Sequence, residues 1–129
     1  MHLYVDGYTI GANPSKVGGG YVVMDERKNV LWEGKCLKPN FTNNEAELIA
    51  IMRATELAHQ NDTIFTDSHC AWCWVIGGHC KARRDLNKYA AQSQCNMYDK
   101  NLTIKQIPRE INLAGIYLED KKYGTIIPR

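Results

Sequence analysis

The feature that most constrains the fold is a helix that begins at Thr42 and carries two glutamates near its start. Thr42 and Glu45, three residues later, match a capping box, in which each side chain bonds the other residue's backbone N–H. This local role accounts for Glu45. Glu47 has no such role, because its neighbours one turn on are Ala50 and Ile51, on the side that the helix buries. A buried charge needs a partner, and we expect a divalent metal ion shared with acidic residues from other segments.

The first third of the chain predicts an antiparallel meander. Apolar alternation indicates a strand over residues 2–7, with Asp6 near its end, and two further strands over residues 21–24 and 29–37. A glycine-rich loop separates the first two strands, and a polar turn separates the second from the third. Sequential strands joined by short connections favour antiparallel pairing.

A crossover through the long helix is expected to bring two aspartates together. The helix is predicted over about residues 43–59, and a short apolar strand over residues 63–66 delivers Asp67 at its carboxyl end. A strand reached through a helix usually pairs in parallel with an earlier strand. If that strand is the first one, Asp6 and Asp67 lie side by side at the carboxyl ends of adjacent strands, where open α/β sheets place their sites.

The remaining segments complete an α/β pattern. Helices are predicted over residues 68–75, 85–98 and 112–119, and a fifth strand over residues 102–107. The length of 129 residues fits one domain spanning residues 1–129. We expect the charged residues 120–129 to form a loosely held tail.

The composition is that of an ordinary globular protein, with 44% hydrophobic and 23% charged residues. A formal charge of +2 does not exclude nucleic-acid binding, since acids gathered into a site leave the other surface more basic. No apolar run is long enough to span a bilayer and the start is unlike a signal peptide, so we expect no membrane partner and a cytoplasmic location. Five cysteines without framework-like spacing indicate reduced thiols.

Five short motifs fall at the ends of the predicted elements. They are Tyr4-Val5-Asp6-Gly7, Asn13-Pro14, Thr42-Asn43-Asn44-x-x-Glu47-Leu48, Thr66-Asp67-Ser68 and Pro108-Arg109-Glu110-x-Asn112. In this order and at these intervals they resemble type 1 ribonuclease H, and the match extends from residue 2 to about residue 119. The resemblance implies a ribonuclease H-like α/β fold, with a five-stranded mixed sheet flanked by helices. It also implies an endoribonuclease that cuts the RNA strand of RNA–DNA hybrids.

The resemblance gives the three carboxylates a role. Hydrolysis of a phosphodiester requires a deprotonated water on one side of phosphorus and stabilisation of the leaving 3′ oxygen on the other, which two cations about 4 Å apart provide. Mg²⁺ prefers oxygen ligands, so Mg²⁺ is the expected cofactor, with Mn²⁺ as a substitute. By similarity, Asp6 bridges both ions, while Glu47 and Asp67 hold the ion beside the leaving group.

One position departs from the family pattern. Family members carry a fourth carboxylate, an Asp in the last helix three residues after the motif Asn, and this chain has Gly115 there. That Asp helps to hold the ion that activates the water, so the departure predicts an enzyme that is slow or metal-selective. Glu119 lies four residues on, and so on the same helical face, which makes it a candidate replacement. Simple solvation near the helix end is the alternative for Glu119.

The resemblance also implies contacts with the substrate. Asn13, Asn43 and Asn44 match positions that touch the minor groove of the hybrid, where amide groups can read the 2′-hydroxyl. For Asn43 and Asn44, ordinary chemistry of a first helical turn is an alternative. Ser68 and Asn112 belong to matching motifs and are carried over as substrate-binding residues. The candidate phosphate contacts are Lys16, Lys81, Arg83 and Arg84. Solvation is the alternative for these loop cations.

Two other interpretations stay open. His69-Cys70-x-x-Cys73 followed by His79-Cys80 has the residue types of a zinc site, although Cys70 and Cys73 fall on a short helix where buried free cysteine is common. The second alternative is a ribonuclease H fold that lost turnover with Gly115 and binds hybrids or a protein partner. Three retained carboxylates argue against it, because their repulsion without metal destabilises the fold. We therefore expect an enzyme. We also expect it to be a monomer.

Overall fold

A five-stranded mixed sheet forms the centre of the structure, a computed structural model in which residues 1–121 are described. Its strands are β1 (His2–Thr9), β2 (Gly19–Asp25), β3 (Val30–Cys36), β4 (Thr63–Thr66) and β5 (Thr103–Gln106), in the spatial order β3-β2-β1-β4-β5. The pairs β1–β2 and β2–β3 are antiparallel, whereas β1–β4 and β4–β5 are parallel. The predicted meander and the predicted parallel crossover onto the first strand are confirmed.

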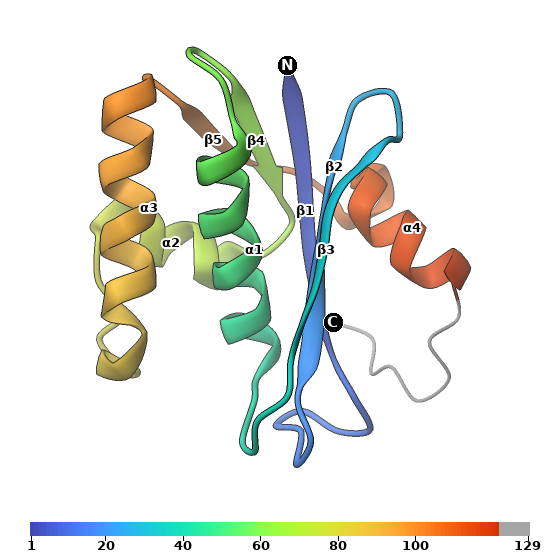
Figure 1. Cartoon of the computed structure of the whole chain (residues 1–129). Coiled ribbons are helices and arrows are strands. Elements are labelled where there is room, and N and C mark those ends of the chain that lie inside the picture. The colour runs from blue at the N-terminus through green and yellow to red at the C-terminus, as the bar shows by residue number, and fades with distance from the viewer. Residues whose placement is uncertain (122–129) are drawn as a thin grey trace.

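Helices cover both faces of this sheet. They are α1 (Asn43–Leu57), α2 (His69–Gly77), α3 (Asn87–Lys100) and α4 (Leu113–Lys121), with two short 3-10 helices, η1 (Arg84–Leu86) and η2 (Arg109–Ile111). Figure 1 shows α1, α2 and α3 on one side of the sheet and α4 on the other. None of the helices within residues 1–121 has the length and apolarity needed to cross a membrane.

The predicted elements differ from the observed ones mainly at their ends. The helix predicted from residue 85 starts with η1 and reaches Lys100, where Asn101 adopts the left-handed conformation that often follows a helix. The long helix stops at Leu57, because Ala58 is extended. Of the tail predicted over residues 120–129, residues 122–129 lie outside the described part of the chain.

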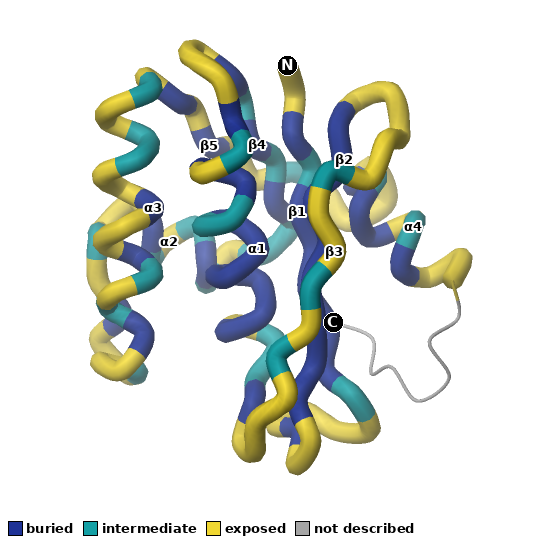
Figure 2. Tube along the Cα trace, in the orientation of Figure 1, coloured by how far each residue is buried: buried dark blue, intermediate teal, exposed yellow. Residues whose placement is uncertain are grey.

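Strand β1 separates two apolar cores. Leu3 and Val5 belong to the larger core, together with the buried face of α1, and Tyr8 belongs to a smaller core under α4. Figure 2 shows α1 and the central strands as the most deeply buried segments. Because successive side chains of a strand point to opposite faces, Asp6 lies on the same face of β1 as Tyr8, toward α4.

Gly7 allows α1 to pack closely against β1. A Cβ atom at this position would lie 2.6 Å from the Cβ of Ala46 and 2.9 Å from the backbone nitrogen of Glu47. The backbone N–H of Gly7 also donates a 3.0 Å hydrogen bond to Oε1 of Glu47. The absence of a side chain at Gly7 therefore lets the helix approach the strand closely enough for this hydrogen bond, which holds the Glu47 carboxylate in place.

Replacing Gly7 with Ala is expected to destabilise the fold by about 1–3 kcal/mol, as overpacking a tight contact usually does. The added methyl group would meet the backbone of α1, which cannot move without disturbing the core. Urea unfolding of the parent and the variant measures the difference. Gly77→Ala is the matched control, because a Cβ at Gly77 would meet no atom closer than 3.7 Å and that variant should keep the parent's stability. Equal stability of Gly7→Ala and the parent would contradict this account.

Candidate active site

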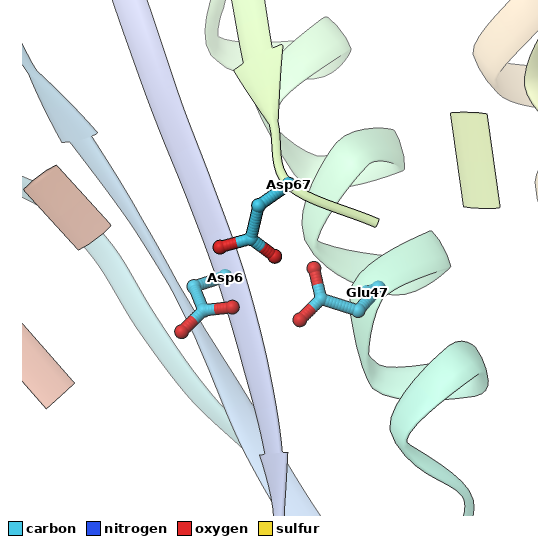
Figure 3. A group of neighbouring side chains, drawn as sticks. All are labelled: Asp6, Glu47 and Asp67. Atoms are coloured by element: carbon cyan, nitrogen blue, oxygen red, sulfur yellow. The ribbon is translucent and has the colours of Figure 1, made fainter. Parts of the chain in front are cut away.

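Three carboxylates from separate elements meet beside β1, just beyond its pairing with β4. Asp6 comes from β1, Glu47 from α1, and Asp67 follows β4 directly (Figure 3). One oxygen of each lies within 4.8 Å of one oxygen of the other two. Asp6 and Glu47 are buried and Asp67 is half-buried. Within residues 1–121, this is the one group of three or more histidine, cysteine or acidic side chains close enough to hold a metal ion.

The parallel pairing of β1 and β4 places the two aspartates. Tyr4 pairs with Phe65, so Asp6 and Asp67 stand two residues further along their strands, at the same end of the sheet. Glu47 reaches the group from the second turn of α1, and the N–H of Gly7 holds one of its oxygens. The convergence that strand ends and helix periodicity predict is therefore present in the structure.

Asn112 is a positioning residue for Asp67. Its side chain is fully buried, and its amide nitrogen donates to the carbonyl of Val5 at 2.9 Å and to Oδ2 of Asp67 at 3.0 Å. Its amide oxygen accepts a 3.2 Å hydrogen bond from the N–H of Ala114, in the first turn of α4. The substrate-binding role of Asn112 stays a prediction. In the structure, its side chain is buried and makes its hydrogen bonds within the protein, where it orients Asp67.

Within residues 1–121, neither Gly115 nor Glu119 adds a carboxylate to the group, although the sequence predicts a role for both positions. Gly115 is buried in α4, one turn after Asn112. Glu119 is exposed and does not belong to the carboxylate group. A helix rises about 1.5 Å per residue, so Glu119 is carried about 6 Å further along the helix axis than Gly115. The structure does not bring Glu119 to the place predicted for it.

The side chain of Glu45 contacts residues outside its own helix, which a capping box does not require. The hydroxyl of Thr42 accepts a 3.1 Å hydrogen bond from the N–H of Glu45, which is the expected half of the motif. The carboxylate of Glu45, however, is fully buried and forms ion pairs with Lys38 and with Arg83. The explanation of Glu45 by local capping alone is therefore wrong.

Arg83 is held by acidic residues of the protein itself. Its guanidinium contacts Asp85 at 2.8 Å and Glu45 at 3.3 Å. The hydrogen bonds to Asp85, reinforced by the charge of Glu45, raise the pKa of Arg83. Its positive charge is thus balanced within the protein, unlike those of the exposed Lys16, Lys81 and Arg84. Arg83 is better explained as a structural cation than as the phosphate contact that the sequence predicts.

A pocket of about 410 Å³ opens beside the carboxylates. It is lined by Asn13, Asn43, Asn44, Glu47, Asp67, Ser68, His69, Cys70 and Arg109. Four residues predicted to bind substrate are therefore gathered at two of the three carboxylates. Asn13 and Asn43 are also joined directly, because the side-chain oxygen of Asn13 accepts a 3.1 Å hydrogen bond from the N–H of Asn43. Ser68 caps α2 by accepting from the N–H of Ala71.

Sequence reasoning did not assign three residues of this pocket, His69, Cys70 and Arg109, to the site. Arg109 belongs to one of the five motifs and supplies a cation at the rim, a role that its charge and its place just after the fifth strand could have suggested. His69 follows Ser68 directly, and its ring bonds the side chain of Gln106 at 2.9 Å. No local sequence pattern predicts the contact between His69 and Gln106, since the two residues lie 37 positions apart.

The structure does not form the alternative zinc site. Cys80 is fully buried in the larger core, whereas Cys73 is exposed and lies 3.4 Å from the ring of His69. Within the described residues, no three of the histidines and cysteines approach one another closely enough to share an ion. The zinc hypothesis is wrong, because these side chains do not gather into a group of three or more ligands.

The family assignment agrees with this geometry. A sequence model of the RNase H family matches residues 1–114. The chain belongs to the RNase H family. Its membership makes it a ribonuclease H-type enzyme, in a family that generally depends on divalent metal ions, and the carboxylate group supplies suitable ligands.

Solved structures of RNase H1 domains share the fold over nearly the whole chain. The N-terminal RNase H domain of Rv2228c from Mycobacterium tuberculosis is 26% identical, with 91% of this chain and 93% of that chain covered and a TM-score of 0.66. RNase H1 from Halobacterium salinarum NRC-1 is 25% identical, with 92% and 97% covered and a TM-score of 0.65. A search of curated protein sequences found no match.

A third structure contains nucleic acid. LC11-RNase H1, isolated from compost by a metagenomic approach, was solved in complex with an RNA/DNA hybrid. It is 29% identical to this RNase H chain, with 86% of this chain and 87% of that chain covered and a TM-score of 0.62.

Replacing Asn112 with Ala is expected to lower the free energy of unfolding by about 1–3 kcal/mol, because the buried carbonyl of Val5 loses its donor. The variant should also bind Mn²⁺ more weakly, since Asp67 loses the hydrogen bond that orients it. Urea unfolding and calorimetric Mn²⁺ titration measure the two effects. Asn96→Ala, which removes a hydrogen bond to Thr55 on the far side of α1, is the control and should leave Mn²⁺ binding unchanged. Unchanged Mn²⁺ affinity in Asn112→Ala would show that Asn112 does not position Asp67.

Proposed function

We propose that this RNase H family member hydrolyses the RNA strand of RNA–DNA hybrids, with cleavage beside Asp6, Glu47 and Asp67. The observation that carries the proposal is the convergence of these three carboxylates at a pocket rimmed by amide side chains and Arg109. The similarity to LC11-RNase H1, which was solved with an RNA/DNA hybrid, supports the substrate class. A cytoplasmic monomer is proposed on the sequence alone.

The residues at the site fit a pair of hard divalent cations, Mg²⁺ or Mn²⁺. All three members of the group offer carboxylate oxygens, which are the ligands that such ions prefer. Asp6, Glu47 and Asp67 are the residues that would hold these ions. When bound, the two cations supply positive charge that favours deprotonation of the attacking water and stabilises the leaving 3′ oxygen.

Hydrogen bonds within the protein orient two of the carboxylates in the absence of a ligand. The N–H of Gly7 holds Glu47, and the amide of Asn112 holds Asp67. These hydrogen bonds fix the directions of the oxygens, so little ordering is left to occur on binding. The cost is the mutual repulsion of nearby negative charges, which bound cations relieve.

The polar residues that line the pocket are proposed to bind the hybrid. Asn13, Asn43 and Asn44 present amide groups that both donate and accept, as contact with a ribose 2′-hydroxyl requires. Arg109 supplies a positive charge for a backbone phosphate. Ser68 adds a hydroxyl at the same rim. These groups read sugar and backbone rather than bases, which suits an enzyme that acts on hybrids of any sequence.

The glycine in α4 is proposed to reduce turnover. Gly115 leaves the site without the carboxylate that would face the water-activating ion, and Glu119 lies outside the group. We therefore propose a slow or Mn²⁺-dependent enzyme. The buried Gly115 also favours a second candidate function, in which the same pocket binds hybrids without cutting them.

The test is cleavage of an end-labelled RNA–DNA hybrid with Mg²⁺ and, separately, with Mn²⁺. The parent should cut the RNA strand, and Gly115→Asp should cut it at least about tenfold faster, the scale at which groups around a metal site matter. An aspartate in the first turn of α4 also suits the positive end of the helix. Glu119→Gln is the control and should keep the parent's rate.

The other outcomes separate the candidates. Cleavage by Gly115→Asp alone would favour the binding function for the natural chain. Failure of both proteins to cut any hybrid would contradict the proposed activity.

A further inference from the structure

Glu45 is a buried acid at the amino end of α1, and two cations from other segments neutralise it. One oxygen contacts the ammonium of Lys38, and the other lies 3.3 Å from the guanidinium of Arg83. Arg83 also contacts Asp85, at 2.8 Å. Glu45 itself is 0% exposed, while Lys38 and Arg83 reach it from the surface.

This network ties three separate segments together. Lys38 lies in the connection from β3 to α1, Glu45 in the first turn of α1, and Arg83 in the connection from α2 to η1. The amino ends of α1 and α3 lie at the same end of the molecule (Figure 1), and η1 leads directly into α3. The first turn of α1 also carries Asn43 and Asn44, which line the pocket.

The ion pairs of Glu45 with Lys38 and Arg83 are expected to be strong, because breaking one of them is costly. A buried carboxylate is costly unless oppositely charged groups pair with it, and removal of one partner leaves an uncompensated charge. The amino end of a helix favours a negative charge only modestly. If the α2–η1 connection moved away, Glu45 would therefore lose one of its two cations. The connection is thereby held against α1.

Exposed cations flank Arg83 in sequence, with Lys81 in the connection and Arg84 at the start of η1. Lys81 and Arg84 are both exposed, whereas the charge of Arg83 is balanced by Glu45 and Asp85. A nucleic-acid strand presents one phosphate about every 3.4 Å along the duplex axis. A duplex seated on Asn43 and Asn44 therefore brings several phosphates near that end of α1.

We propose that Glu45 is a positioning residue for hybrid binding, which acts through Arg83 to hold Lys81 and Arg84 where the phosphate backbone passes. The proposal deepens the function assigned to the pocket and rests on it. Glu45 touches neither substrate nor metal. Its effect is to fix the place of a basic loop whose own residues would otherwise lose conformational freedom on binding.

The test is binding of a fluorescently labelled RNA–DNA hybrid, measured by anisotropy in EDTA over a series of salt concentrations, so that no cleavage is needed. Glu45→Gln should bind several-fold more weakly than the parent. Its plot of log affinity against log salt should be shallower by about 1 for each phosphate that the loop no longer neutralises. Its affinity for Mn²⁺ should match that of the parent, because the three clustered carboxylates remain.

A double-mutant comparison distinguishes positioning from general loss of structure. Lys81→Ala/Arg84→Ala should weaken hybrid binding by itself, and adding Glu45→Gln to that protein should weaken it little further. Glu56→Gln is the matched control, because Glu56 pairs with Arg53 on the exposed side of the same helix. That variant should bind the hybrid as the parent does.

If Glu45→Gln does not fold, Arg83→Gln replaces it in the same binding measurement. This variant breaks the link to Glu45 but leaves Glu45 paired with Lys38, and it should weaken hybrid binding in the same way. Unchanged affinity and salt dependence in the folded variants would overturn the proposal, as would fully additive effects in the double-mutant comparison. A parent protein that binds no hybrid at all would overturn the proposed function of the pocket, and this inference with it.

Discussion

The close approach of α1 to β1 at Gly7 is the contact on which the rest of the structure depends. It is possible because no Cβ stands between the strand and Ala46, and the N–H that it exposes bonds Glu47. Parallel pairing of β1 with β4 then brings Asp67 to the same place as Asp6. The amide of Asn112 ties Asp67 to β1 and to the start of α4. Backbone geometry thus forces three negative charges together, and a divalent cation is the natural partner for them.

Features set by local periodicity could be predicted from the sequence. The strand that precedes Asp67 and the helical position of Glu47 follow from local residue patterns. The first strand continues past Asp6 to Thr9, so Asp6 lies within the strand rather than near its end. Its parallel pairing with β4 still brings the predicted carboxylates together. The contacts of Glu45 and Asn112 could not be predicted. Arg83 lies 38 residues from Glu45, and Val5 lies 107 residues from Asn112. Such partners are set by how elements pack, which no spacing of residue types encodes. The zinc hypothesis failed for the same reason, because packing buries Cys80 in the larger core and leaves Cys73 exposed.

In the proposed function, Gly115 limits the chemistry of a site whose other parts are in place. The fold, the pocket and three carboxylates are in place, and the family assignment rests on residues 1–114, which end just before this glycine. The proposed loss of a fourth carboxylate would lower the repulsion within the group, but it would also leave fewer ligands for the second cation of the proposal. The expected result is a site that holds hybrids and at least one cation well, with turnover limited on the water-activating side.

Calorimetric titration of Mn²⁺ into the parent protein and into Asp6→Asn tests the central claim most directly, because it asks whether the clustered carboxylates bind metal without relying on turnover. Asp6 stands on β1, the strand that pairs with β4 and packs against α1, so its neutralisation should weaken Mn²⁺ binding at least about tenfold. The same replacement should not unfold the protein, since it removes a repulsive charge from a crowded site. Equal Mn²⁺ affinity in the two proteins would contradict the assignment of this site.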